Sequence, residues 1–151
     1  MIAYQLSVFA ENKPGRLAKV TRILARAKLN IRAITISTSE DFGVVNVLVS
    51  DPKQGKKVLE KEGLTVSLKE VIAVLIEDRP GGLDQLVQLL ADENINVENA
   101  YGFVLESWKK AVFVIDVDQL EKAQQVLKKS GFETLNAEAL SAVEPFHYMK
   151  Y

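Results

Sequence analysis

Residues 11–17 read Glu-Asn-Lys-Pro-Gly-Arg-Leu, and residues 77–83 read Glu-Asp-Arg-Pro-Gly-Gly-Leu. The two stretches lie 66 residues apart, and at the same offset Asn30-Ile31 aligns with Asn96-Val97. A repeat of this length indicates two copies of one structural unit. The sequence therefore predicts one module at residues 1–69, a second at 70–140 and a tail at 141–151.

The offset between the copies grows along the chain. It becomes 67 where Val45 and Val47 align with Val112 and Val114, and 68 where Gly63 aligns with Gly131. An insertion inside a strand would exchange the two faces of that strand. We therefore expect each slip to lie in a connection.

Each copy shows the same succession of periodicities. Alternating apolar residues predict a first strand, and apolar residues three and four apart after each Pro-Gly predict an amphipathic helix. Proline suits the first turn of that helix, and Asn12 or Asp78 suits its cap. A predicted hairpin (31–39 with 44–49, and 97–105 with 111–117), a second helix (53–62 and 120–130) and a short last strand follow. The order βαββαβ predicts an α+β, ferredoxin-like module with an antiparallel sheet and both helices on one face.

Composition excludes several kinds of chemistry. The chain has no cysteine and a single histidine, His147 in the tail, so thiolate zinc sites and disulfides lose their residues. No stretch resembles a leader peptide or approaches the roughly 18 apolar residues of a membrane span. We expect a cytoplasmic protein without catalytic residues, cofactor, metal or membrane partner, in which Phe146, His147 and Tyr148 either dock on a second copy or remain loosely packed.

Charge is distributed unevenly between the halves. Residues 1–70 contain 12 basic and 7 acidic side chains, whereas residues 71–151 contain 7 and 13. Aligned positions also reverse in sign, as Arg26 and Asp92 do. A basic half is typical of a nucleic-acid-binding surface or of a surface that pairs with an acidic one. We favour pairing of modules or of copies, because the central strands offer only one aromatic residue on which an RNA base could stack.

The motif at residues 11–17, followed by one helix and by Leu29-Asn30-Ile31, resembles the ACT domain family, and residues 77–83 with Ile95-Asn96-Val97 repeat the resemblance. Members of this family are regulatory modules that pair and bind amino acids between two modules. The resemblance thus implies a non-catalytic amino-acid sensor that forms a homodimer. The first copy is also similar to the regulatory subunit of acetolactate synthase, which implies regulation of a separate biosynthetic enzyme as an alternative. An acylphosphatase-like enzyme on this fold would need a phosphate loop, which the sequence lacks.

The resemblance also implies site residues. In the serine-sensing domain of phosphoglycerate dehydrogenase, the ligand is contacted by the asparagine before the Pro-Gly turn and by the asparagine that opens the second strand. A helix N-terminus also attracts a carboxylate. The alternative is that these residues only cap helices or form turns. The candidate ligand-binding residues are Asn12, Pro14, Gly15, Arg16, Leu17, Asn30 and Ile31 in the first copy, and Asp78, Pro80, Gly81, Gly82, Leu83, Asn96 and Val97 in the second.

The two candidate sites differ in sequence. Asp78 replaces Asn12 and adds a carboxylate that suits an ammonium group, and Gly82 replaces Arg16. We expect Gly82 to widen the turn of the second copy, because glycine removes a side chain there. Two identical sites are therefore not expected.

Overall fold

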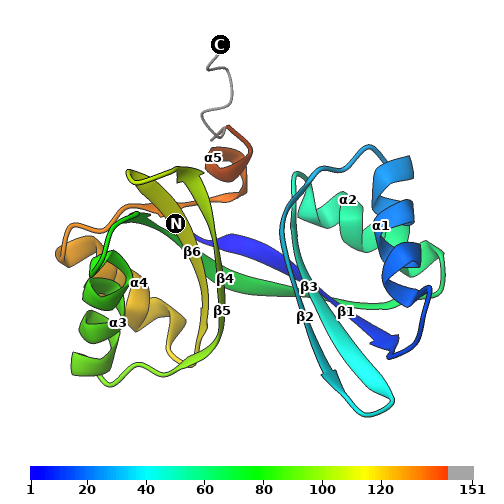
Figure 1. Cartoon of the computed structure of the whole chain (residues 1–151), viewed down its shortest axis with the longest axis horizontal. Coiled ribbons are helices and arrows are strands. Elements are labelled where there is room, and N and C mark those ends of the chain that lie inside the picture. The colour runs from blue at the N-terminus through cyan, green and yellow to red at the C-terminus, as the bar shows by residue number, and fades with distance from the viewer. Residues whose placement is uncertain (143–151) are drawn as a thin grey trace. The chain divides into compact units, whose positions relative to one another are not determined.

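Two compact units make up the chain in the computed structural model, which describes residues 1–142. Module 1 is the unit formed by Tyr4–Glu70. Module 2 is formed by Met1–Ala3 together with the chain from Val71 onward. In each module, two helices cover one face of a sheet (Figure 1).

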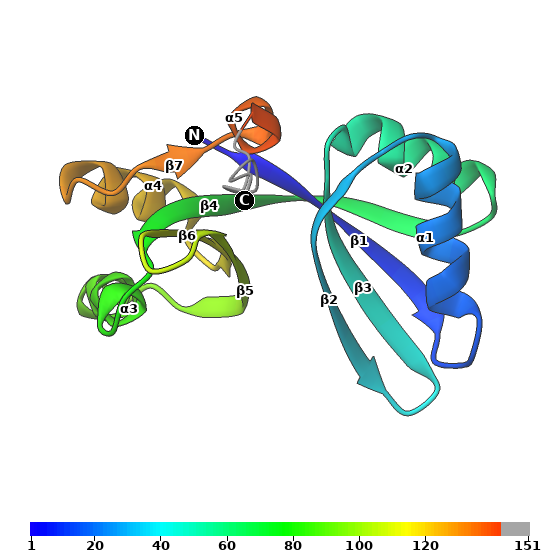
Figure 2. The ribbon, with the colours of Figure 1, turned by 45° about the horizontal axis from the view of Figure 1, so that its top comes forward.

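Module 1 has the strand order of a ferredoxin-like fold. Its elements are β1 (Ala3–Glu11), α1 (Arg16–Arg26), β2 (Ile31–Ser39), β3 (Phe42–Val49), α2 (Pro52–Lys61) and the first part of β4 (Thr65–Glu77). The order is β2-β3-β1 with β4 beside β1, and β3 pairs antiparallel with both β1 and β2. Helices α1 and α2 lie on the same side of these strands (Figure 2). The core between the layers contains Leu6, Val8, Val20, Leu24 and Val47, all fully buried.

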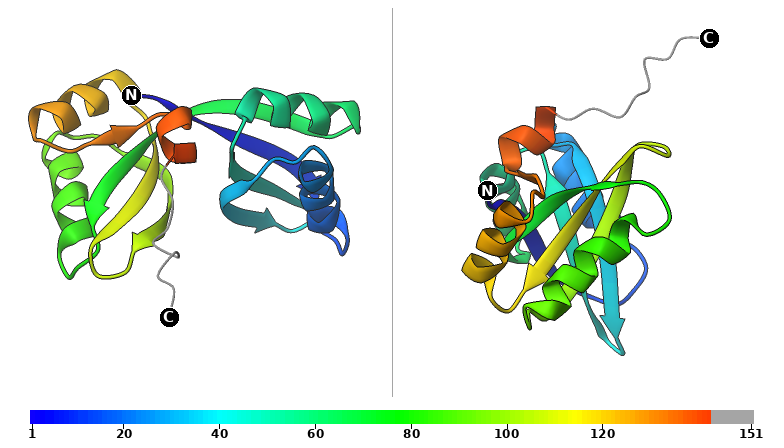
Figure 3. Two further views of the ribbon diagram at one scale, coloured as in Figure 1. Left: turned by 90° about the horizontal axis from the view of Figure 1, so that it is seen from above. Right: turned by 90° about the vertical axis from the view of Figure 1, so that its left-hand side faces the viewer.

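Module 2 repeats this arrangement. Its elements are the second part of β4, α3 (Gly82–Asp92), β5 (Val97–Glu106), β6 (Lys110–Val117), α4 (Leu120–Lys129), β7 (Thr134–Leu135) and α5 (Ala137–Ala142). The order β5-β6-β4-β7 is antiparallel throughout. Helices α3 and α4 cover the same face (Figure 3), and Ile72, Val74, Leu86 and Ile115 lie beneath them. The predicted α+β fold of two βαββαβ modules is confirmed.

Local residue choice explains the ends of the second helices. Gly63 and Gly131 follow α2 and α4 with φ of 85° and 84°, a conformation in which a side chain is disfavoured. Asp51 accepts a hydrogen bond from the backbone N–H of Gln54 at 3.1 Å and so caps α2. The glycine ends that the sequence predicts are confirmed.

The structure corrects the alignment of the third strands. Val45 and Val47 face the helices of module 1, whereas Phe113 and Ile115 face those of module 2. The offset between β3 and β6 is therefore 68, and the offset of 67 expected for Val45 is wrong. One extra residue forms a bulge in β5, where the register shifts between Val104 and Glu106, and the other lies in the hairpin turn. The expectation that each slip lies in a connection is therefore wrong for the first of them, because a bulge accommodates an extra residue within a strand.

One predicted feature cannot be compared with the structure. Phe146, His147 and Tyr148 lie outside the described residues.

No helix within residues 1–142 is long and apolar enough to cross a membrane.

Candidate ligand-binding site

A left-handed glycine begins the first helix of each module. Gly15 (φ 91°) and Gly81 (φ 87°) are the N-caps of α1 and α3, and no side chain caps either helix. The expectation that Asn12 or Asp78 caps the helix, with proline in its first turn, is therefore wrong. The prolines precede the cap. The N–H groups of Arg16 and Gly82 donate to the carbonyls of Lys13 and Arg79, and the N–H groups of the next two residues of each helix are left for solvent or a ligand.

Asn12 and Asp78 instead join the Pro-Gly turn to the hairpin of their own module. The Asn12 Nδ2 group donates to the backbone carbonyl of Glu40 at 2.9 Å, and Asp78 Oδ2 accepts from the backbone N–H of Trp108 at 2.7 Å. Glu40 and Trp108 occupy equivalent hairpin positions with φ of 51° and 65°. Each of these two hydrogen bonds, which we call braces, uses one side-chain atom of Asn12 or Asp78. The Trp108 side chain itself is 78% exposed, so it does not pack on its own module.

Asn30 and Asn96 open the second strands through their backbones. The N–H of Asn30 donates to Ser50 Oγ at 3.1 Å, and that of Asn96 donates to Asp118 Oδ1 at 3.0 Å. Both asparagine side chains are exposed, and neither makes a hydrogen bond with any of residues 1–142. Their amide groups are therefore available to a ligand.

The turn and the strand start lie at opposite ends of the first helix. In module 1, Pro14, Gly15, Arg16 and Leu17 precede or begin α1, while Asn30 and Ile31 follow its other end. An 11-residue helix is about 16 Å long at ~1.5 Å per residue. The helix α3 separates Pro80, Gly81, Gly82 and Leu83 from Asn96 and Val97 in the same way. Neither module alone brings its two groups of candidate residues together.

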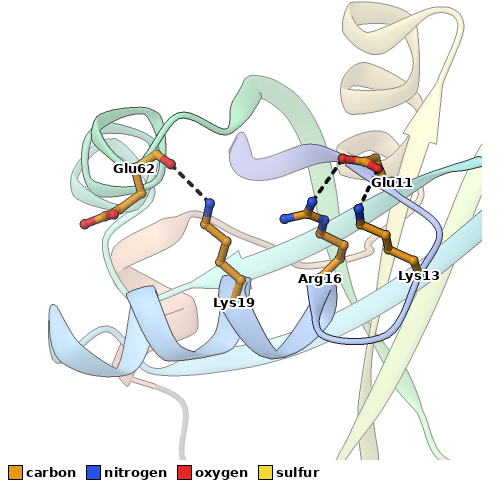
Figure 4. A network of polar contacts seen from close by, with 5 residues as sticks. All are labelled: Glu11, Lys13, Arg16, Lys19 and Glu62. Carbon is orange, nitrogen blue, oxygen red and sulfur yellow. Dashed lines mark hydrogen bonds and ion pairs between the residues drawn. The ribbon is translucent and has the colours of Figure 1, made fainter.

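Two cationic side chains fill the space beside the turn of module 1 (Figure 4). Arg16 donates through Nη2 to Glu11 Oε1 at 3.0 Å, and Lys19 donates through Nζ to the backbone carbonyl of Glu62 at 3.3 Å. Lys13 Nζ lies 3.0 Å from the other oxygen of Glu11. Lys13 first, and then Arg16, hold the pKa of the Glu11 carboxyl below its usual value.

Module 2 has a cavity of about 630 Å³ beside its turn. Gly82, which replaces Arg16, is buried, and a Cβ at this position would lie 2.0 Å from the carbonyl oxygen of Glu77. The backbone of Gly82 therefore packs closely on Glu77, and the side chain that glycine lacks leaves space beside the turn, as the sequence led us to expect. The cavity is lined by Leu75, Ile76, Glu77, Gly82, Gln85, Glu106, Lys109, Lys110, Ser130, Gly131, Phe132 and Glu133. The replacement of Arg16 by glycine predicted space beside the turn, whereas the walls formed by β6 and by the end of α4 were not predicted.

Polar groups are also buried on the sheet faces that carry no helix. In module 1, Gln5 Nε2 donates to Ser7 Oγ at 3.2 Å, and Ser7 Oγ donates to Asn46 Oδ1 at 2.8 Å. In module 2, burial raises the pKa of the Tyr101 phenol, and the charge of Asp116 raises it further. Sequence reasoning missed these groups, which appear as polar residues within apolar strands.

Metal coordination has no evident site in the described part of the chain. Within residues 1–142, no group of three or more His, Cys, Asp or Glu side chains is placed to hold a metal ion.

The tandem ferredoxin-like modules, each with a glycine-initiated first helix, define a two-module α+β protein. A family model described as ACT domain pair matches residues 1–143, and the chain belongs to this family. This fold is typical of amino-acid-binding domains that have a regulatory and not a catalytic role.

Several known proteins are similar to this chain in structure or in sequence. The crystal structure of protein BT0572 from Bacteroides thetaiotaomicron is similar with a TM-score of 0.88 and 34% identity, over 93% of this chain and 96% of that one. The ligand-free regulatory subunit of aspartate kinase from Thermus thermophilus shares the fold with a TM-score of 0.61 and 16% identity, over 87% and 97%. D-3-phosphoglycerate dehydrogenase 3, chloroplastic, of Arabidopsis thaliana is 34% identical over 102 residues, which are 65% of this chain and 16% of that enzyme.

Proposed function

We propose that the protein is a non-catalytic sensor that binds a small amino acid at the Pro-Gly turns of its ACT modules. Membership of the ACT domain pair family supports a regulatory role. The observation that carries the proposal is that both modules combine an uncapped helix N-terminus with an exposed asparagine, Asn30 or Asn96, whose side chain has no partner among residues 1–142.

The two halves of such a site suit the two charged groups of an amino acid. The first-turn N–H groups after Gly15 and Gly81 and the helix dipole attract the α-carboxylate. Side-chain oxygens of Asn30 or Asn96 accept hydrogen bonds from the α-ammonium group. Because the halves lie at opposite ends of a helix, one ligand needs the turn of one module and the strand start of another.

A homodimer would supply further interfaces between modules, and one of them can hold the copies together without itself forming the ligand site. Arg26 on α1 and Asp92 on α3 are exposed at equivalent positions with opposite charges. Leu17, on α1, and Leu83 and Val87, on α3, are 40%, 41% and 41% exposed and add apolar area to the same helices. In the proposed homodimer, the α1 surface of one copy meets the α3 surface of the other, so that opposite charges face each other.

Ligand binding would stabilise the paired arrangement by its differential affinity for that arrangement, and a separate enzyme could respond to the difference. The fold shared with a regulatory subunit of aspartate kinase supports a role of this kind. The partner would be a separate enzyme of amino-acid biosynthesis, for which acetolactate synthase is one candidate.

Thermal unfolding in the presence of each of the twenty amino acids tests the proposal. A ligand at 100 times its dissociation constant adds about 2.7 kcal/mol to the stability of the native state. We expect one amino acid, or a few related ones, to raise the unfolding midpoint.

Asn30→Ala and Asn96→Ala sharpen this test, because neither side chain makes a hydrogen bond within residues 1–142. Each variant should keep the ligand-free midpoint and lose part or all of the ligand-induced rise. Asn12→Ala is the matched control for a structural effect, since it breaks the brace to Glu40 and should lower the ligand-free midpoint. No rise with any amino acid, or a rise that survives Asn30→Ala combined with Asn96→Ala, would overturn the proposal.

A further inference from the structure

The cavity of module 2 occupies the place where module 1 holds the side chains of Arg16 and Lys19. The repeat offset of 66 aligns Gly82 with Arg16 and Gln85 with Lys19. Gly82 and Gln85 line the cavity, and both are uncharged. Module 2 has therefore lost two cationic groups from a position that module 1 fills with them.

The groups that bind these cations remain in module 2. Glu77, which aligns with Glu11, pairs through Oε2 with Arg79, as Glu11 pairs through Oε2 with Lys13. The Oε1 atom, which in Glu11 binds Arg16, has no partner among residues 1–142 in Glu77. Glu77 is one of the residues that line the cavity, so its Oε1 atom is the candidate acceptor there.

A second acceptor lies across the cavity at the end of α4. Ser130 aligns with Glu62 at the offset of 68 that relates α2 to α4. The Glu62 carbonyl accepts from Lys19, whereas the Ser130 carbonyl accepts no hydrogen bond within the described part of the chain. Carbonyl groups at a helix C-terminus attract cations.

The remaining walls suit a cation on an alkyl stem. Leu75, Ile76 and Phe132 supply apolar surface. Among the charged residues that line the cavity, Lys109 pairs with Glu106 at 2.9 Å, and Lys110 and Glu133 add one charge of each sign. With Glu77, the lining contains three carboxylates and two ammonium groups. Apolar walls that end in a carboxylate accommodate a methylene chain with a charged head group.

We propose that this cavity binds a small organic cation with a guanidinium group on a short alkyl stem. The guanidinium group takes the place of the Arg16 guanidinium, with Glu77 and the Ser130 carbonyl as acceptors. A planar guanidinium has several N–H donors in a fixed arrangement and binds a carboxylate strongly. A volume of about 630 Å³ is also within the range of small-molecule sites. The site lies within module 2, so it depends neither on module pairing nor on amino-acid sensing at the turns.

A titration of the ¹⁵N-labelled chain with methylguanidinium chloride, followed by amide chemical shifts at constant ionic strength, tests the site. We expect saturable shifts at the amides of Gln85, Gly131 and Glu133, and none at the aligned positions of module 1. Methylammonium should bind at least tenfold more weakly, because it has no planar fork of donors. Shifts that spread over both modules without saturation would overturn the proposal.

Further variants test the site by exchanging residues between aligned positions of the two modules. Gln85→Lys places a lysine where Lys19 lies and should abolish the saturable shifts, whereas Gln88→Lys adds the same charge on an exposed position of α3 and should preserve them. Arg16→Gly combined with Lys19→Gln gives module 1 the residues of module 2 at both positions and should create a second set of saturable shifts in module 1. Retained binding in Gln85→Lys, or no new site in the Arg16→Gly, Lys19→Gln double variant, would refute the argument. The response to amino acids is measured separately and is not altered by either failure.

Discussion

Replacing Gly82 by alanine should destabilise module 2 by about 2–4 kcal/mol. The added Cβ would lie 2.0 Å from the carbonyl oxygen of Glu77, where real Cβ contacts are essentially never closer than 3.0 Å, so helix α3 and the end of β4 would have to separate by about 1 Å. Overpacking of this kind costs about 1–3 kcal/mol. The shift would also break the hydrogen bond from the Gly82 N–H to the Arg79 carbonyl at 2.9 Å, which adds about 0.5–1.5 kcal/mol.

Urea unfolding would measure this effect in both modules. Amide signals of the ¹⁵N-labelled chain report on each module separately, whereas circular dichroism reports on both. Gly81→Ala is the matched control, because its Cβ meets no atom within 4 Å and only the left-handed φ of 87° opposes it. That strain costs about 1–2 kcal/mol. A Gly82→Ala variant no less stable than Gly81→Ala would refute the close contact with Glu77.

Three further predictions concern other parts of the chain. Asp78→Ala should lower the unfolding free energy by about 1–2 kcal/mol in urea titrations, because the N–H of Trp108 loses its charged acceptor, and an unchanged midpoint would contradict the brace. Arg26→Asp and Asp92→Arg should each weaken the proposed dimer in sedimentation experiments, whereas the double variant or a mixture of the two should restore it; single variants that associate like the wild type would exclude α1–α3 pairing. The raised pKa of Tyr101 should leave stability unaffected below about pH 10, where the phenol is protonated in both states, and decrease stability above that pH, where only the unfolded chain ionises. Tyr101→Phe should remove this alkaline decrease, and equal slopes in both proteins would rule out the tyrosine as its cause.

Predictions that depend on neighbours in the chain were the most successful. The apolar spacing after each Pro-Gly predicts α1 and α3, and Gly63 and Gly131 mark the ends of α2 and α4. Periodicity and backbone preference act over a few residues, so a sequence displays them directly. The duplication then extends each prediction to the other module.

Two predictions failed where a contact between distant segments decided the outcome. Asn12 was expected to cap a helix, but its side chain binds the carbonyl of Glu40, 28 residues away. The alignment of Val45 with Val112 was wrong because an offset in sequence does not show which side of a strand faces the helices. Only a folded sheet decides that.

The sequence by itself determined the repeat, the order of elements and the positions of both Pro-Gly turns, because these follow from local periodicity and from residues with restricted backbones. The tertiary structure alone decided what surrounds the turns. It put the Arg16 and Lys19 side chains into a space that stays open beside Gly82. It also left the side chains of Asn30 and Asn96 without hydrogen-bond partners among residues 1–142 and about one helix length from the turns. A cavity or a free acceptor is the result of several segments meeting, and the order of residues in any one segment does not record that meeting.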